Sequence, residues 1–228
     1  MFSFRKRRGA LLTGLVVAGV AATAFFLTTI HTKAQGEPGG LSQADITHIV
    51  QAGDSAAEHT ASALRSVDPV HGPKRPTKMV VAIVARDGKL LEVHAQPDAW
   101  VGSIDIAIAK ARTAAFFSSN ENALTSRIIG VLSQAHNPDG SGGAGPLWGI
   151  GDSNQVGITG SPEFRNGIIT FPGGLPLYKN GRLVGGVGVS GDAVDQDEFV
   201  AFKAAVGFAP GSNVVSLGFT PPTVPPFP

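Results

Sequence analysis

The chain of 228 residues contains no cysteine, which excludes a disulfide framework, thiolate metal sites and cysteine nucleophiles. It also has few charged residues, 15% of the total, beside 43% apolar residues. Thirty glycines and 16 prolines interrupt it, which is typical of a turn-rich fold with strands and not of a helical bundle. The composition therefore predicts a packed core of one domain, or of two small ones.

Acidic residues are absent from the first 34 positions, which hold five of the 18 Lys and Arg. Four basic residues at 5–8 precede an uncharged run from Gly9 to Ile30, and Thr32 and Ala34 then supply small residues. This order predicts an export signal, 1–34, cleaved after Ala34. A retained membrane anchor is the alternative, because the run is long enough to span a bilayer. We therefore expect an exported protein, periplasmic or secreted, that touches a membrane only if this segment is retained.

The rest of the chain has 13 basic and 17 acidic residues, a net charge of −4. Since nucleic-acid binding rests on neutralising phosphates, an acidic domain without a basic stripe is predicted not to bind nucleic acid. His48 and His59 lie on one polar side of a predicted helix, but their separation of ~16 Å is too large for one metal ion. No metal site and no catalytic residues are predicted.

The predicted elements mix helices and strands. A linker, 35–40, leads to a helix over 41–65 with Ser42 as N-cap. Apolar runs on either side of Asp87-Gly88 predict a hairpin over 79–94 with a type I′ turn. Then follow helices over 103–117 and 122–134, a long loop over 135–165, and strands over 167–171, 175–178 and 182–190, the last two joined by a turn at Lys179-Asn180-Gly181. A final helix runs from 195 to about 208, and the acids of its first turn, Asp195, Asp197 and Glu198, suit the positive end of the helix dipole. The proline-rich end, 209–228, is predicted to be an extended tail that forms neither helix nor sheet.

The helix over 103–117 is apolar on two sides. One stripe carries Ile104, Ile108, Ala111 and Ala115, and a nearly opposite stripe carries Ile106, Lys110, Thr113 and Phe117. A sheet can cover only one of them. The second stripe therefore needs a ligand, another segment of the chain such as 122–134, or another subunit.

The stretch from Gly185 to Gly191, GGVGVSG, has the glycine spacing of a dinucleotide-binding loop. Such a loop needs a further strand after its helix and an acid about 20 residues on. Here the helix runs into the proline-rich end, and no Asp or Glu follows Glu198. We therefore expect these glycines to let a neighbouring backbone approach the strand closely.

Three motifs carry a resemblance to a known family. They are Ser103-x-Asp105-Ile106-Ala107-x-x-Lys110-Ala111-x-Thr113-Ala114, then Pro172-Gly-Gly-x-Pro176, then Val184-Gly-Gly-Val-Gly-Val-Ser-Gly191 followed by Gln196-Asp197-Glu198. Over 41–208 the chain resembles the haem-binding or haem-degrading domains of GlcG/HbpS type. The resemblance implies an α/β (α+β), PAS- or profilin-like fold, with a five-stranded antiparallel sheet packed with helices and assembly into homo-oligomers. Some members bind haem, others belong to glycolate-utilisation operons, and others accompany cobalamin enzymes.

Haem needs an apolar slot, cations for its propionates and usually an axial ligand. Ile106 and Phe117 are predicted to cover a flat apolar ligand, and Lys110 to pair with a propionate. Arg112 is a second candidate for the propionates, as is Arg127. Thr113 is a candidate for a weak oxygen ligand, and His94 is the best histidine candidate.

The expected function is that of an exported binding protein for haem or a related tetrapyrrole, acting as scavenger, carrier or sensor. Two alternatives stay open. A protein that binds or processes small organic acids would use Lys110, Arg112 and the Ser190-Gly191 turn. A structural oligomeric module would bury the second stripe between subunits.

Overall fold

The computed structural model describes residues 40–65, 74–136, 143–148, 150 and 167–227. The predicted export segment, nearly all of the linker and most of the 135–165 loop lie outside the described residues. The elements are α1 (Gln43–Glu58), β1 (Val80–Ala85), β2 (Leu90–Ala95), α2 (Ser103–Phe116), β3 (Asn122–Leu124), α3 (Ser126–Leu132), β4 (Gly174–Lys179), β5 (Arg182–Ser190), α5 (Val194–Ala204) and β6 (Val215–Leu217). None of the helices described is long and apolar enough to cross a bilayer.

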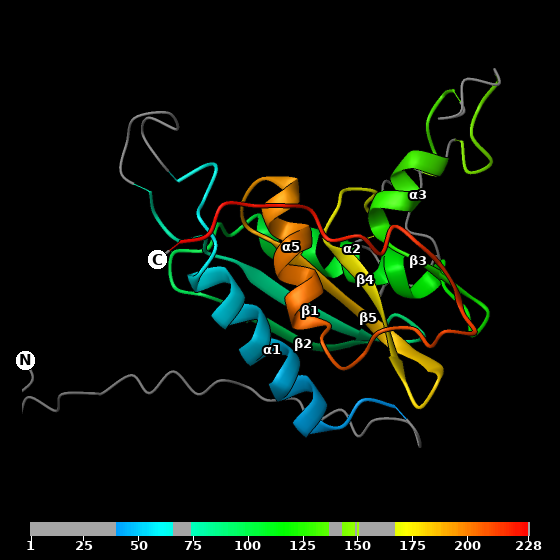
Figure 1. Cartoon of the computed structure of the whole chain (residues 1–228), viewed down its shortest axis with the longest axis horizontal. Helices are drawn as coiled ribbons and strands as arrows, with labels where there is room; N and C mark the ends of the chain where they lie inside the picture. The colour runs from blue at the N-terminus through cyan, green and yellow to red at the C-terminus, as the bar shows by residue number, and fades with distance from the viewer. Residues whose placement is uncertain (1–39, 66–73, 137–142, 149, 151–166, 228) are drawn as a thin grey trace, which may run out of the picture. The chain divides into compact units, whose positions relative to one another are not determined.

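An antiparallel sheet in the order β2-β1-β5-β4 separates two layers of helices (Figure 1). The side chains of β1 alternate between them. Val81 and Ile83 join the core beneath α1 and α5, whereas Val80 and Ala82 pack against α2 on the opposite face. Both faces of β1 are therefore buried, which explains its continuous apolar run, and the mixed α/β fold with an antiparallel sheet is confirmed.

The glycines of β5 lie under the backbone of α2. A Cβ atom added at Gly188 would lie 2.0 Å from the carbonyl oxygen of Ala107, and one added at Gly186 would lie 2.3 Å from that of Ala111. No side chain fits in these spaces. The glycine spacing thus serves close packing of helix on strand, and the prediction of a close backbone approach is confirmed.

Local turn and cap chemistry agrees with the sequence at two places and differs at two others. The hydroxyl of Ser42 accepts a hydrogen bond from the Asp45 amide, while the Asp45 carboxylate accepts one from the Ser42 amide, so the N-cap is confirmed. Asn180 and Gly181 both have positive φ, which gives the β4–β5 hairpin a type I′ turn. In the β1–β2 hairpin only the glycine of Asp87-Gly88 has positive φ, and the strand register shifts beside it. The type I′ turn predicted there is wrong, and α1 ends at Glu58, short of the predicted residue 65.

The fifth strand that was expected, over 167–171, does not form a strand. Its residues lie along α2, where the amide of Ile169 donates to the hydroxyl of Thr113 at 3.0 Å. The helix predicted over 122–134 is also divided, because β3 occupies its first turn and the hydroxyl of Thr125 caps the shorter α3. The sheet therefore has four strands in the part of the chain described.

The proline-rich end packs on the domain instead of leaving it. Its red trace runs across the domain in Figure 1. Strand β6 pairs in parallel with β3, Phe219 packs edge-on against Phe202 of α5, and the amide of Phe227 donates to the carbonyl of His59. The prediction that this end forms no sheet is wrong. Proline excludes a central strand but leaves a short edge pairing possible.

Candidate functional site

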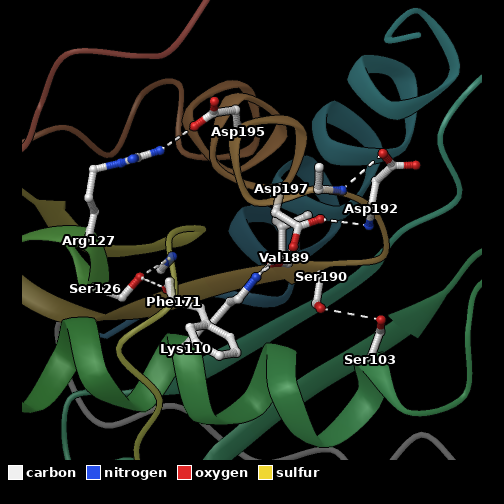
Figure 2. A network of polar contacts seen from close by, with 12 residues as sticks. Ser103, Lys110, Ser126, Arg127, Phe171, Val189, Ser190, Asp192, Asp195 and Asp197 are labelled. Atoms are coloured by element: carbon white, nitrogen blue, oxygen red, sulfur yellow. Dashed lines mark hydrogen bonds and ion pairs between the residues drawn. The ribbon is translucent and has the colours of Figure 1, made fainter. Parts of the chain in front are cut away.

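Lys110 of α2 forms a buried ion pair with Asp197 of α5 (Figure 2). Its Nζ lies 2.7 Å from Oδ2 of Asp197 and 2.9 Å from the carbonyl oxygen of Val189, to which it also donates. The two side chains are only 1% and 4% exposed. Because α2 and α5 cover opposite faces of the sheet, this pair ties the two helical layers together beside β5.

Burial works against the charges of this pair. It lowers the pKa of Lys110 and raises the pKa of Asp197, and in each case the attraction of the partner opposes the shift. The amide of Asp192 donates to the second Asp197 oxygen at 2.9 Å. Three hydrogen bonds thus keep the pair in place. Removing either partner would leave the other charge buried and unpaired.

The loop of the second motif closes over the pair. Gly173 has φ of 112°, and a Cβ atom there would lie 3.1 Å from Nζ of Lys110. The hydroxyl of Ser126 donates to the carbonyl of Phe171 at 2.6 Å and accepts from the amide of Gly174 at 2.8 Å. The three sequence motifs therefore meet at one place, and their meeting point is a polar core.

A second acidic group lies beside this core. Arg127 donates from Nε to Glu198 and from its terminal nitrogen to Asp195, both at 2.6 Å. Glu198 is 1% exposed, and burial raises its pKa against the attraction of Arg127. Arg127, a candidate for the propionates, is thus held by two carboxylates.

The polar residues predicted on α2 are bonded within the domain. Lys110 is held by Asp197, and the hydroxyl of Thr113 lies 2.9 Å from the carbonyl of Ala109 and 2.8 Å from that of Ile169. Arg112 is 4% exposed and donates from Nε to the carbonyl of Gly88 at 3.1 Å. These hydrogen bonds position α2, the segment 167–171 that lies along it, and the β1–β2 turn.

The apolar residues and His94 lie elsewhere. Ile106 of α2 and Phe117, the C-cap residue of α2, are half-buried. His94 faces α1, where its Nε2 lies 2.8 Å from Oδ2 of Asp54, and its cross-strand neighbour Val81 belongs to the core on that side. The sheet therefore separates His94 from α2, so the six predicted residues do not form one site. Contact of any of them with a ligand stays a prediction.

Sequence reasoning missed the partner of Lys110. Asp197 had been interpreted as an acid of a helix N-terminus, and it lies 87 residues further along the chain. The one signal was that Lys110 lies in an apolar stretch of α2, where a charged side chain needs a partner. Among the described residues, no three His, Asp or Glu side chains come together to hold a metal ion.

A sequence model of the family described as haem degrading protein HbpS-like matches residues 54–206. The chain belongs to this HbpS-like family. It is 32% identical over 126 residues to a 15.0 kDa protein from the dhaT-dhaS intergenic region of Citrobacter freundii, across 55% of this chain and 72% of that one. It is 28% identical over 180 residues to the corrinoid adenosyltransferase PduO of the same organism, across 78% of this chain. The HbpS-like chain spans only 42% of the length of that PduO.

Two solved structures share the HbpS-like fold. The complex of PduOC with heme has a TM-score of 0.52 and 25% identity, and the match covers 76% of this chain and 98% of that one. Protein ORFY of Klebsiella pneumoniae also has a TM-score of 0.52, with 24% identity over 76% of this chain and 93% of that one. The second likeness shows the fold alone.

Proposed function

We propose that this domain binds haem or a related tetrapyrrole on the outer face of α2, which we define as the half-buried side chains of Ile106 and Phe117. The observation that carries the proposal is the similarity to the heme complex of PduOC, which spans nearly that whole chain. Membership of the HbpS-like family supports the same ligand class.

The apolar side chains of α2 suit a flat macrocycle. The inner stripe, with Ala107 and Ala111, is buried against the sheet, whereas Ile106 and Phe117 keep part of their surface in water. Covering such surface contributes about 25 cal/mol for each Å² removed from water. A tetrapyrrole ring is large and apolar enough to gain from this contact.

The polar side chains, as they are bonded here, do not fit an iron ligand or a propionate partner. Moving Lys110 to a propionate would leave the carboxylate of Asp197 buried without its cation, at a cost of several kcal/mol. The hydroxyl of Thr113 already accepts a hydrogen bond from the amide of Ile169. We therefore assign no axial ligand. A site without one binds haem modestly, which suits a scavenger, carrier or sensor better than a redox enzyme.

Export is part of the proposal. The basic residues at 5–8, the uncharged run 9–30 and the small residues before position 35 have the order of a cleaved signal. Fractionation of cells that produce the full chain, with N-terminal sequencing of the product, tests it. A product outside the cytoplasm that begins at Gln35 is expected, whereas an intact cytoplasmic chain would contradict export.

Titrating haemin into the full chain and following the Soret band tests ligand binding. We expect a saturable change at micromolar haemin. Ile106→Ser combined with Phe117→Ser is expected to weaken binding by roughly tenfold or more, because both lose apolar contact. Val206→Ser is the matched control, since Val206 is 58% exposed just after α5, on the other side of the sheet.

Two results would overturn the proposal. One is a Soret band that haemin titration leaves unchanged. The other is equal weakening by the α2 double variant and by the Val206 control, which would place the ligand elsewhere. Sedimentation of the ligand-free chain runs beside the titration, because a self-association that the α2 variant abolishes would make a second copy the occupant of this face.

A further inference from the structure

Three exposed apolar side chains lie where the loop after α1 meets the loop before α2. Leu64 is 67% exposed, Trp100 63% and Val101 76%. The guanidinium of Arg65 donates to the carbonyl oxygen of Asp98 at 3.1 Å, which joins the two loops. We call Leu64, Trp100 and Val101 the apolar tip.

The tip is held by backbone contacts and is not a loose end. The carbonyl of Trp100 accepts from the amide of Ser103 at 2.9 Å, and that of Val101 accepts from Ile104 at 3.2 Å, so both residues lead directly into α2. The ring of Trp100 lies against Gly102, where a Cβ atom would come within 2.6 Å of it. The outward position of these side chains is therefore built into the start of the helix.

The tip is flanked by cations. Lys74 and Arg75 are exposed, and the carbonyl of Arg75 accepts from the amide of Ser62 at 2.8 Å, which brings this segment to the loop after α1. With Arg65 they make three cations. Three acids lie nearby: Asp98 on the neighbouring loop, Asp105 at the start of α2, and Asp192, whose carboxylate accepts from the hydroxyl of Ser62 and the amide of Ala63. Tryptophan beside Lys and Arg is typical of side chains that rest in the interface of a bilayer.

We propose that the apolar tip enters the headgroup region of a bilayer with anionic lipids, with Arg65, Lys74 and Arg75 at the lipid phosphates. A second copy of the chain is the alternative occupant, and the experiments below distinguish the two. The uncharged run 9–30 behind four basic residues brings the chain to a membrane during the proposed export. The proposal is independent of haem binding.

The two tryptophans of the chain allow a direct test. In the full chain, Trp148→Phe leaves Trp100 as the single reporter, and Trp100→Phe leaves Trp148, which is 62% exposed and follows α3. Each variant is mixed with vesicles of phosphatidylcholine and phosphatidylglycerol that carry brominated acyl chains. We expect the emission of Trp100 to shift to the blue and to be quenched by the bromolipid, and that of Trp148 to stay unquenched.

A second pair of variants checks the cause. Leu64→Ser with Val101→Ser is expected to lower the quenching of Trp100 at fixed lipid by roughly tenfold, because both lose apolar contact with the bilayer. Neutralising Arg65, Lys74 and Arg75 to Gln is expected to remove the preference for phosphatidylglycerol, as is high salt. These side chains are on the surface, and far-UV circular dichroism confirms that the variants fold.

Equal quenching of Trp100 and Trp148 would overturn the proposal, because attachment through another segment would then account for it. So would a blue shift of Trp100 that appears without vesicles and grows with protein concentration. That result would identify a second copy as the partner of the tip.

Discussion

Asp197→Asn tests the structural role of the buried ion pair. The substitution leaves the ammonium of Lys110, 1% exposed, bonded to the carbonyl of Val189 but to no carboxylate, with Glu198 as the remaining nearby anion. Breaking a buried pair by removing one partner costs about 3–5 kcal/mol, against a total stability of roughly 5–15 kcal/mol for a native protein. We therefore expect the free energy of unfolding to fall by about 3–5 kcal/mol, and the Tm by about 10 °C.

Lys110→Met removes the other partner and makes the sign of the pH dependence visible. Burial raises the pKa of Asp197, and without Lys110 nothing of comparable strength opposes that rise. The folded state of this variant therefore binds a proton more tightly than the unfolded state does. Its loss in free energy of unfolding, relative to the unsubstituted chain, should be smallest at low pH. The loss should grow as the pH rises through the folded pKa of Asp197.

Urea unfolding followed by far-UV circular dichroism gives these free energies. The double variant Lys110→Met/Asp197→Asn should recover part of the loss, with a coupling energy of at least about 2 kcal/mol. Asp195→Asn is the matched control, because it breaks a pair with Arg127 in which both side chains are at least one-third exposed, and it should cost less than about 1 kcal/mol. If Asp197→Asn costs no more than that control, the buried pair does not hold the layers together.

Three further substitutions or titrations follow from other parts of the fold. Gly188→Ala should lower the free energy of unfolding in urea by more than about 4 kcal/mol, because its Cβ would lie 2.0 Å from a carbonyl oxygen of α2. Gly181→Ala, at a residue with positive φ and open space around it, should lower it by about 1 kcal/mol. Equal losses would contradict the close packing of α2 on β5. Burial raises the pKa of Tyr178, the only tyrosine, to about 12. Absorbance at alkaline pH should therefore show no phenolate near pH 10. The stability that the neutral phenol contributes should be lost as the pH rises toward 12. Burial acts to raise the pKa of Asp45, but hydrogen bonds from Lys179 and Ser42 outweigh this effect and hold the pKa below 3.8. Asp45→Asn should therefore lower the free energy of unfolding by about 1 kcal/mol at a pH above 3.8. A loss of the same size at a pH well below 3.8 would count against the ion pair.

Local chemistry carried most of the successful sequence predictions. Ser42 was identified as an N-cap, and Lys179-Asn180-Gly181 as a turn, because each depends on residues a few positions apart. The role of the β5 glycines was also predictable. The helix after them runs into the proline-rich end and no Asp or Glu follows Glu198, unlike in a nucleotide-binding unit, so close packing against a neighbouring backbone is what explains them.

Long-range pairings were not predictable in the same way. Strands β3 and β6 have three residues each and pair across about 90 positions, so neither has a periodicity that indicates a partner. The helical wheel showed that Lys110 lies on a buried side of α2, but a wheel does not say what covers that side. A ligand, another segment of the chain or another subunit was expected to cover the stripe, and Asp197 and the backbone of Ile169 meet its polar members.

Amide hydrogen exchange of the full chain with and without saturating haemin tests the central claim most directly, since it locates the ligand without a substitution. The account predicts protection along α2 around Ile106 and Phe117 and in the segment 167–171 that crosses it, with the surroundings of His94 unchanged. Protection centred on His94 and α1, with α2 unaffected, would contradict it.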